Sequence, residues 1–289
     1  MKIKILIPVY NDFQSLSKVI QEINSIISSL DEEFSIIIVN DASTDKTEID
    51  VSSIDKIHSI KILNIKKNQG HARCIATGLK YIFENEEFNC VIPMDGDGED
   101  RPEEIKNFVE SINFSPDKAI VGERVKRTEK LIFKICYKIH KALTYLSTGQ
   151  SIKFGNYTCL PKLTVEKMIN EKATWSSFSG ALQKVEKDKI EVPSERGARY
   201  FGPSKMSFLN LIKHSLSIIS VFKFNVLIRS VLFLVVYLFL ISENISNVTL
   251  IPFYLVILLN ILTFYFSNRE NINEFNNSLE NINSVEQIK

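Results

Sequence analysis

Two aspartates stand one residue apart directly after a short apolar run. Asp95 and Asp97 flank a glycine and follow residues 90–94, whose sequence is CVIPM. Carboxylates this close repel each other unless a cation lies between them, and Mg²⁺ or Mn²⁺ prefers such oxygen ligands. An acidic turn in front of the helix that Pro102 begins would give the same pattern. The pair therefore indicates a metal site only when it is considered with the other polar segments.

Two further polar segments follow apolar runs in the same way. They are residues 10–12, with the sequence YND, and residues 40–45, with the sequence NDASTD. Asp41 could accept hydrogen bonds from a nucleobase or a ribose, whereas Ser43 and Asp45 could equally form a turn and a helix cap. The patterns GxGxxG after the first run and GxxxxGKS or GxxxxGKT anywhere are absent, which removes the main support for dinucleotide and P-loop sites.

The elements that would position these residues alternate between two patterns over the first 125 residues. Short runs rich in Ile and Val predict strands that are buried on both faces, over residues 3–9, 34–39, 60–65, 90–94 and 119–122. Helical patterns lie between them, over residues 13–29, 70–86 and 102–113. This alternation predicts a mostly parallel α/β sheet, whose ligands bind beyond the carboxyl ends of the strands. The polar segments fall at those ends.

The motifs in these segments resemble those of family 2 glycosyltransferases of the GT-A fold, in the same order along the chain. The matching segments are IPVYND at 7–12, VNDASTD at 39–45, NQGHAR at 68–73 and MDGD at 94–97. The resemblance covers residues 3–125. Two later segments, VGER at 121–124 and RYFGPSKM at 199–206, are similar to the polyprenyl-phosphate sugar transferase branch, which includes dolichyl-phosphate mannose synthases. The Arg-x-x-Gly-x-Ser-Lys pattern in the second of these is the most specific piece.

The resemblance implies a nucleotide-diphospho-sugar transferase domain and assigns its site residues position by position. Nucleotide-sugar contacts would be Pro8, Tyr10, Asp12, Val39, Asp41, Asp95 and Gly96. A Mg²⁺ or Mn²⁺ ion would be held by Asp95, Asp97 and Glu99, and the catalytic set would be Asp97, Arg124, Arg199 and Lys205, whose cations meet phosphate groups. The family often has Glu at position 12 and Gln at position 99, where this chain has Asp and Glu. The Gln-x-x-Arg-Trp motif of processive polysaccharide synthases is absent.

The chemistry of the acceptor separates three alternatives. A polyprenyl phosphate has a second pKa of about 6 and is largely a dianion at pH 7, so it needs no general base but needs cations to hold it near the donor phosphates. A hydroxyl of a lipid or surface glycan would need a base, and residues 150–200 contain no convincing candidate. A catalytically inactive membrane scaffold of the same fold would have no need of the clustered charges of Asp95, Asp97 and Lys205.

A membrane anchor is predicted from two apolar runs near the C-terminus. Residues 226–241 and 248–266 are strongly apolar, and the second run is close to the ~20 residues that a helix needs to cross the hydrocarbon. The connector 242–247 contains no Lys or Arg, whereas basic residues flank the spans at Lys213, Lys223, Arg229 and Arg269. The positive-inside rule therefore predicts two spans, with the catalytic domain and both termini in the cytoplasm. A buried helical hairpin of a soluble protein is the alternative.

Basic amphipathic patterns at 130–146 and 206–222 predict helices that lie on an anionic membrane surface. An ordinary packed surface helix explains the first pattern equally well. The predicted organisation is a transferase domain over 1–205, an interfacial helix over 206–225, a transmembrane hairpin over 226–266 and a disordered polar tail over 267–289.

The overall charge and the remaining residues limit the partners. The chain has 35 Lys and Arg against 34 Asp and Glu, which excludes a global basic field for nucleic acid. The expected partners are a nucleotide-sugar donor, a polyprenyl phosphate acceptor and membrane lipids, and a homo-oligomer stays open. Four scattered cysteines indicate neither a zinc site nor a disulfide framework. His71 and His140 are interpreted as structural rather than catalytic residues.

Overall fold

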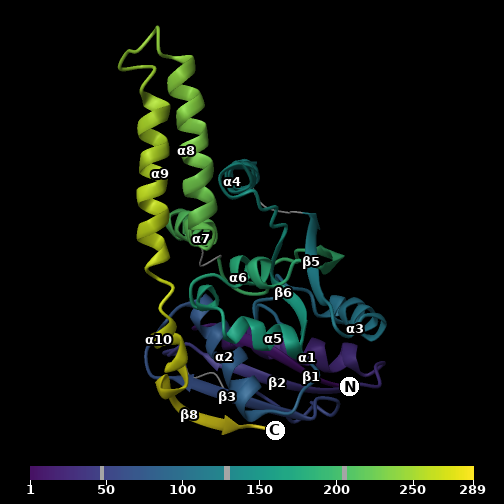
Figure 1. The fold of residues 1–289 in the computed structure, drawn as a ribbon. Helices are drawn as coiled ribbons and strands as arrows, with labels where there is room; N and C mark the ends of the chain where they lie inside the picture. The colour runs from purple at the N-terminus through teal and green to yellow at the C-terminus, as the bar shows by residue number, and fades with distance from the viewer. Residues whose placement is uncertain (46–48, 127–130, 204–206) are drawn as a thin grey trace. The chain divides into compact units, whose positions relative to one another are not determined.

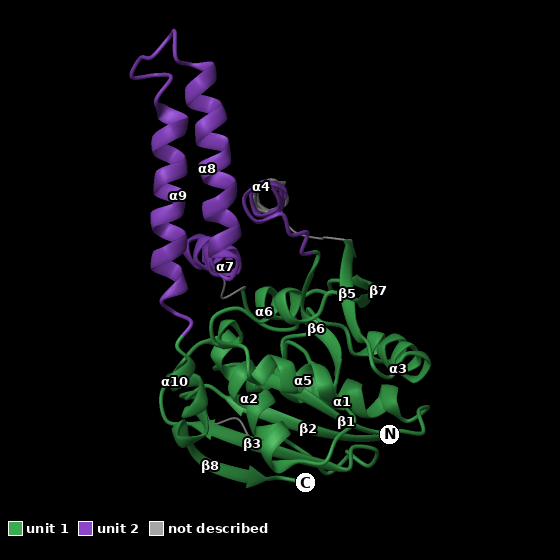
Figure 2. Cartoon of the chain, in the orientation of Figure 1, with its two compact units in different colours: residues 1–128, 153–205, 271–289 green, residues 129–152, 206–270 purple. Residues whose placement is uncertain are grey.

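The computed structural model describes the 289-residue chain except residues 46–48, 127–130 and 204–206 (Figure 1). The chain forms two compact units (Figure 2). Unit 1 consists of Met1–Thr128, Lys153–Lys205 and Asn271–Lys289, and unit 2 consists of Glu129–Ile152 and Met206–Glu270. Both units are therefore built from stretches that lie far apart in the sequence.

Unit 1 is built on one sheet with the order β7-β5-β6-β4-β1-β2-β3-β8 in the described part of the chain. Parallel pairing joins β1 to β2 and β4, β2 to β3, and β5 to β7, whereas β6 and β8 pair antiparallel with their neighbours. The predicted mostly parallel α/β fold is confirmed. The strands are β1 (Lys2–Val9), β2 (Glu33–Asn40), β3 (Ser59–Ile65), β4 (Cys90–Pro93), β5 (Ala119–Lys126), β6 (Phe154–Pro161), β7 (Lys189–Glu195) and β8 (Ile282–Gln287).

Helices cover both faces of this sheet. Successive side chains of a strand point to opposite sides, so each face has its own set of side chains that helices bury. On one face, the fully buried Ile3, Ile5 and Ile7 of β1 pack with α1 (Phe13–Ile27) and α3 (Ile105–Phe114). On the other face, Leu6 lies against Gly78 of α2 (His71–Asn85), where a Cβ would collide with it. The remaining helices of unit 1 are α5 (Lys162–Ile169), α6 (Phe178–Val185), α10 (Ile272–Asn276) and the 3-10 helices η1 (Pro102–Glu104), η2 (Lys172–Trp175) and η3 (Ser278–Asn281).

The C-terminal residues 271–289 are part of the fold of unit 1. β8 pairs antiparallel with β3, and the fully buried Phe275 stacks its ring on Trp175 at a centroid distance of 5.5 Å. The prediction of a disordered tail over 267–289 is therefore wrong for these residues. Their Asn- and Glu-rich composition concealed the fold, because β8 is held by main-chain hydrogen bonds and a single aromatic side chain anchors the segment before it.

Unit 2 is entirely helical in its described part, with α4 (Leu131–Thr148), α7 (Phe208–Ser220), α8 (Lys223–Leu240) and α9 (Ile251–Ser267). α8 and α9 run side by side, and α7 and α4 lie across their base (Figure 1). Large apolar side chains such as Phe239, Leu240 and Tyr265 are more than two-thirds exposed. By length and composition, Lys223–Leu240 and Ile251–Asn276 could each cross a membrane. The two apolar runs are thus confirmed as helical, and their membrane topology stays a prediction.

The C-terminal end of α4 is capped by side chains of α8. Nη1 of Arg229 donates to the main-chain oxygen of Leu146 at 3.4 Å, and Nδ2 of Asn225 donates to that of Thr148 at 3.3 Å. A Cβ on Gly149 would lie 2.6 Å from the Arg229 guanidinium, so glycine makes room for it. A cation at the carbonyl end of a helix also interacts favourably with the helix dipole. α4 is therefore attached to the first turns of α8 within unit 2.

Candidate active site

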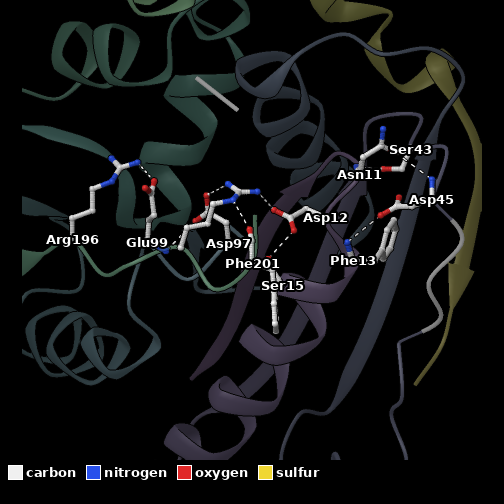
Figure 3. Close-up of polar contacts among 11 residues, drawn as sticks. Asn11, Asp12, Phe13, Ser15, Ser43, Asp45, Asp97, Glu99, Arg196 and Phe201 are labelled. Carbon is white, nitrogen blue, oxygen red and sulfur yellow. Dashed lines mark hydrogen bonds and ion pairs between the residues drawn. The ribbon is translucent and has the colours of Figure 1, made fainter. Parts of the chain in front are cut away.

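The loops that follow β1 and β2 are hydrogen-bonded to each other at the carboxyl edge of the sheet (Figure 3). The main-chain nitrogen of Asn11 donates to Oγ of Ser43 at 2.9 Å, and that of Thr44 donates to Oδ1 of Asn11 at 2.6 Å. Asn11 and Ala42 both have positive φ, at 50° and 56°. This is a conformation that non-glycine residues adopt rarely and that clusters at functional sites. The exposed Tyr10 therefore lies beside two loops that are hydrogen-bonded to each other and contain strained main-chain conformations.

Asp41 lies within this edge and is almost fully buried. Its Oδ1 accepts a hydrogen bond from the main-chain nitrogen of Gln69 at 2.7 Å, and its Oδ2 accepts one from that of Gly70 at 2.9 Å. Gly70, with a φ of 92°, directly precedes α2. In this structure Asp41 thus shapes the turn into α2, and its predicted contact with a nucleotide stays a prediction.

Three other predicted contact residues lie at the same edge and are closely packed, with Pro8 and Val39 buried and Gly96 half-buried. Pro8 and Val39 are partners in the β1–β2 register, and the Val39 side chain is turned toward Gly78 of α2. Gly96 approaches β1 so closely that a Cβ would lie 2.8 Å from the side chain of Ile7. Val39 and Gly96 are therefore placed to shape the site through their main chains.

The acidic loop after β4 folds back on itself. The main-chain nitrogen of Asp95 donates to Oδ2 of the buried Asp100 at 2.9 Å, and that of Glu99 donates to Oδ1 of Asp97 at 2.9 Å. Gly98 has a φ of 90°, which allows the reversal at little steric cost. Four carboxyl groups are thereby gathered within one tight loop.

Burial and mutual repulsion distribute the charge of this loop unevenly. Burial and the neighbouring Asp95 raise the pKa of Asp97 to about 6 and that of Asp100 to about 7. Burial alone would also raise the pKa of Asp95, but the adjacent His71 outweighs it and holds that pKa well below its usual range. Asp95 therefore carries the most persistent negative charge in the loop.

Two arginines from the segment after β7 pair with this loop (Figure 3). Nη1 of Arg199 donates to Oδ2 of Asp97 at 2.7 Å, and its Nη2 donates to Oδ2 of Asp12 at the start of α1. Arg196 pairs with Glu99 in the same way. The structure thus brings together three predicted residues, Asp12, Asp97 and Arg199, from three distant parts of unit 1.

Arg124 on β5 extends over β6. A Cβ on Gly155 would lie 2.5 Å from the Arg124 guanidinium, so the strand must have glycine where the arginine crosses it. The charge of Arg124 also acts to lower the pKa of both Asp95 and Asp100. Arg124 therefore acts electrostatically on the acidic loop, and its predicted contact with a phosphate group stays a prediction. Lys205, the remaining predicted cation, lies outside the described residues.

The structure adds three residues that the sequence patterns did not identify. Arg196 pairs with Glu99, Asp100 holds the main chain of Asp95, and His71 Nε2 lies 3.2 Å from Oδ1 of Asp95. His71 was interpreted as structural, but it faces the acidic loop and lies 2.7 Å from Nδ2 of Asn156. The excess of acids over 95–100 was a signal that further cations had to lie near, although it did not identify them.

The predicted metal ligands fit a hard cation by chemistry. Oδ1 of Asp95 is buried and receives no well-aligned hydrogen bond from the described residues, although His71 Nε2 lies 3.2 Å from it, and a buried carboxylate oxygen of this kind suits a divalent ion. Asp97 and Glu99 supply further carboxylates but face Arg199 and Arg196. Accordingly, no three His, Cys, Asp or Glu side chains converge as a metal site within the part of the chain that the structure describes.

Comparisons with known proteins agree with this fold. A model of the family described as Glycosyl transferase family 2 matches residues 4–162. The structure of S. aureus TarS with UDP-GlcNAc is similar at 14% identity and a TM-score of 0.52, covering 97% of this chain and 91% of that one. Glucosyl-3-phosphoglycerate synthase from Mycobacterium tuberculosis, in complex with Mn²⁺, UDP and glucosyl-3-phosphoglycerate, is similar at 13% identity and a TM-score of 0.53, covering 78% and 79%. Mannosyl-3-phosphoglycerate synthase from Rubrobacter xylanophilus matches at 13% and 0.53, covering 76% and 72%.

Proposed function

This chain belongs to glycosyl transferase family 2, and we propose that it moves a sugar, with inversion, from a nucleotide sugar to a polyprenyl phosphate at the cytoplasmic face of a membrane. The observation that carries the proposal is the meeting of Asp12, Asp97 and Arg199 at the carboxyl edge of the sheet. Acids and arginines held together in this way suit a site that must bind a diphosphate through both a metal and direct hydrogen bonds.

The donor side of the site is formed by the acidic loop. Asp95 and Asp97 would hold Mg²⁺ or Mn²⁺, which supplies positive charge to the diphosphate leaving group. The M. tuberculosis synthase, which was solved with Mn²⁺ and UDP, supports a divalent metal and a nucleotide donor here. Arg199, which contacts both Asp12 and Asp97, could donate two parallel hydrogen bonds to phosphate oxygens.

The acceptor side needs charge rather than a base. A phosphate oxygen forms a bond to the anomeric carbon while the bond from that carbon to the diphosphate breaks on the opposite face, and the diphosphate leaves with the electron pair. Since the acceptor is already anionic, no proton has to be removed. Arg124 and Lys205 are the proposed cations for this group, with Arg199 shared between the two phosphate sites.

The exposed helices of unit 2 suit a lipid-borne acceptor. The chain leaves unit 1 after residue 205, runs through α8 and α9, and returns to unit 1 at residue 271. Since 271–289 form part of the same sheet as 1–65, the two spans must begin and end on the side of the membrane where unit 1 lies. The connector between α8 and α9 then lies on the other side. This supports a hairpin with both ends on the side of unit 1, and the basic residues that flank the spans favour the cytoplasm for that side.

A labelling experiment tests this topology. In a cysteine-free chain, Ser246→Cys in the connector should react with a membrane-impermeant maleimide added outside intact cells, and Ser284→Cys in β8 should react only after lysis. Labelling of both residues from outside, or of neither, would contradict the hairpin.

The function itself is tested with purified full-length protein and Mn²⁺, a panel of UDP- and GDP-sugars, and undecaprenyl phosphate. Mass spectrometry should show a lipid phosphate that has gained one sugar and loses it in mild acid. The panel includes 3-phosphoglycerate and a hydroxyl-bearing glycolipid, because two similar structures are synthases of phosphoglycerate glycosides. Transfer only to a hydroxyl would favour a base-dependent enzyme. If none of the acceptors receives a sugar from any donor, an inactive scaffold would be favoured.

A further inference from the structure

The segment that carries Arg196 and Arg199 is attached to the acidic loop along its main chain. The main-chain nitrogen of Gly197 donates to the carbonyl oxygen of Glu99 at 2.8 Å, and that of Tyr200 donates to the carbonyl oxygen of Asp97 at 2.9 Å. A Cβ on Gly197 would lie 2.5 Å from the carbonyl oxygen of Gly98, so the two chains approach as closely as a glycine permits. The two segments therefore form one main-chain pairing at the site.

The Tyr200 side chain stabilises this pairing of the arginine segment with the acidic loop. Its ring lies over Gly98, where a Cβ would be 2.7 Å from the ring carbons, and its hydroxyl donates to Oε2 of Glu22 on α1. Nζ of Lys18 lies 4.1 Å from the centre of the same ring. The ring also packs against the main hydrophobic core of unit 1. One side chain thus connects the arginine segment, the acidic loop and α1.

In this arrangement Tyr200 does not take part in the proposed chemistry itself, but it positions Arg199 and Asp97, which do. Arg199 directly precedes Tyr200, and its guanidinium meets Asp97, whose carbonyl the Tyr200 nitrogen holds. A long arginine side chain loses conformational freedom when it binds a phosphate, and that loss is smaller when its main chain is already fixed. Fixing residue 200 therefore prepares both Arg199 and Asp97 for a diphosphate.

We propose that Tyr200 is a positioning residue for donor binding, which holds Arg199 and Asp97 in register through Gly98 and Glu22. The inference rests on the proposed function, since the group that Arg199 and Asp97 jointly meet is the metal-bound diphosphate of the donor. Tyr200 contacts neither the sugar nor the phosphates, and its whole effect passes through Arg199 and the acidic loop.

The test measures nucleotide affinity and stability on the same variants. Full-length protein in detergent is titrated with UDP and with GDP in the presence of Mn²⁺ by calorimetry, and its Tm is recorded without nucleotide. Tyr200→Ala should weaken binding by roughly tenfold or more, and Tyr200→Phe, which keeps the ring, by about two- to threefold. Glu22→Gln keeps an acceptor for the hydroxyl and should bind almost as the unmodified chain does.

A double variant shows whether Tyr200 acts through Arg199. Arg199→Gln alone should weaken binding strongly, and adding Tyr200→Ala should then weaken it by clearly less than the loss that Tyr200→Ala causes alone, because one of the two groups that Tyr200 positions is already gone. Tyr157→Phe is the matched control. The Tyr157 hydroxyl donates to the carbonyl oxygen of Arg101 at 2.7 Å. The Tyr157→Phe variant therefore loses one hydrogen bond from a tyrosine hydroxyl outside the arginine segment. It should lower Tm without changing nucleotide affinity.

The outcomes separate the inference from the function on which it rests. If the unmodified chain binds neither nucleotide with Mn²⁺, the proposed donor site fails and the role of Tyr200 fails with it. If the unmodified chain binds but Tyr200→Ala lowers only Tm, Tyr200 is an ordinary packing residue. Losses that multiply in the double variant would also overturn the proposal, because they would show that Tyr200 and Arg199 act independently.

Discussion

The two units of this chain place the same kinds of side chain in opposite positions. In unit 1 the isoleucines of β1 and β2 are completely buried. In unit 2 the large apolar residues of α8 and α9 face outward, as Phe239 and Leu240 do, while Ser220 and Thr263 are fully buried. A soluble core removes apolar surface from water, whereas helices in lipid gain little by doing so and pack through small residues instead. The two units thus distribute apolar and small polar side chains in opposite ways, which is what the proposed anchoring in a membrane requires.

The partners of cationic side chains also differ between the two units. Unit 1 buries Lys4 against the carboxylate of Glu86 at 2.9 Å, with Lys61 at 2.6 Å on the other oxygen. In unit 2, Lys223 donates to Oγ of Ser267 and Arg269 donates to Oγ of Ser217. The two lysines of unit 1 thus share a carboxylate, whereas these two cations of unit 2 donate to hydroxyl groups.

The largest expected effect tests whether 271–289 are a working part of unit 1. Phe275→Ala removes a fully buried ring from its stack on Trp175 and should cost about 3–5 kcal/mol of unfolding free energy. Truncation after residue 270 should be worse, because it also leaves the edge of β3 without its partner. Thermal unfolding of the full-length protein measures both. The control, Val285→Ala, changes a half-exposed side chain of β8 and should have little effect. Equal stability of all these variants would restore the interpretation of a disordered tail.

This segment also shows where sequence patterns stop being informative about the fold. Runs such as residues 36–39 are apolar throughout, so hydrophobic burial alone defines them as strands. β8, with the sequence INSVEQ, has no such run, and it becomes a strand only because the edge of β3 offers it main-chain partners. That edge lies more than 200 residues earlier in the chain, which no local pattern can express.

The next effect tests a buried cluster of charges in unit 1. Glu86→Ala leaves Lys4 and Lys61 without their carboxylate in a nearly closed site, and loss of one member of such a cluster costs about 3–5 kcal/mol. Glu87→Ala is the matched control, since Glu87 pairs with Lys2 on the surface, where water screens the pair, and its loss should change stability little. Similar losses of Tm in both variants would show that the cluster is no more important than a surface pair.

The same cluster gives a pH dependence with a defined sign. Burial alone would raise the pKa of Glu86, but hydrogen bonds and attraction from Lys61 and Lys4 outweigh it and lower that pKa. A lowered pKa stabilises the folded chain above the unfolded value of about 4.3, and the stabilisation is lost as pH falls through the folded value. The Tm difference between the unmodified chain and Glu86→Gln should therefore be largest near neutral pH and shrink in acid. A difference that stays constant across that range would contradict the assignment.

A further prediction concerns the acidic loop of unit 1, which is the proposed metal site. Asp97→Asn removes a proposed metal ligand and should lower transfer by roughly 100- to 1,000-fold. Its Tm should fall less than that of Glu86→Ala, because burial and Asp95 already disfavour a charge at this position. Undiminished, metal-dependent turnover in Asp97→Asn would contradict the metal assignment, and a large loss of Tm would make Asp97 a structural residue.

The site was less predictable than the fold, for a related reason. Asp95 and Asp97 could be proposed because two acids one residue apart follow a strand and stand in one chain with the polar segments 10–12 and 40–45. Arg196 and Tyr200 could not, because their roles exist only once the loop after β7 meets residues a hundred positions earlier. Asp41 illustrates the opposite case, since its motif was visible but its carboxylate is engaged by the Gln69–Gly70 turn.

The smallest effect compares one buried threonine from each unit. Oγ1 of Thr174 in unit 1 donates to the carbonyl oxygen of Met168 at 2.6 Å, whereas Oγ1 of Thr263 in α9 has no hydrogen-bond partner among the described residues. Thr174→Val should therefore cost about 1–3 kcal/mol, because it leaves a buried acceptor without its donor. Thr263→Val removes a hydroxyl that makes no bond, keeps the shape, and should be neutral or stabilising by about 1 kcal/mol. Thermal unfolding of both variants in the same detergent decides the matter. If Thr263→Val is as harmful as Thr174→Val, the hydroxyl is bonded when α8 and α9 are surrounded by amphiphile, and small polar residues hold unit 2 together by hydrogen bonds rather than by close packing alone.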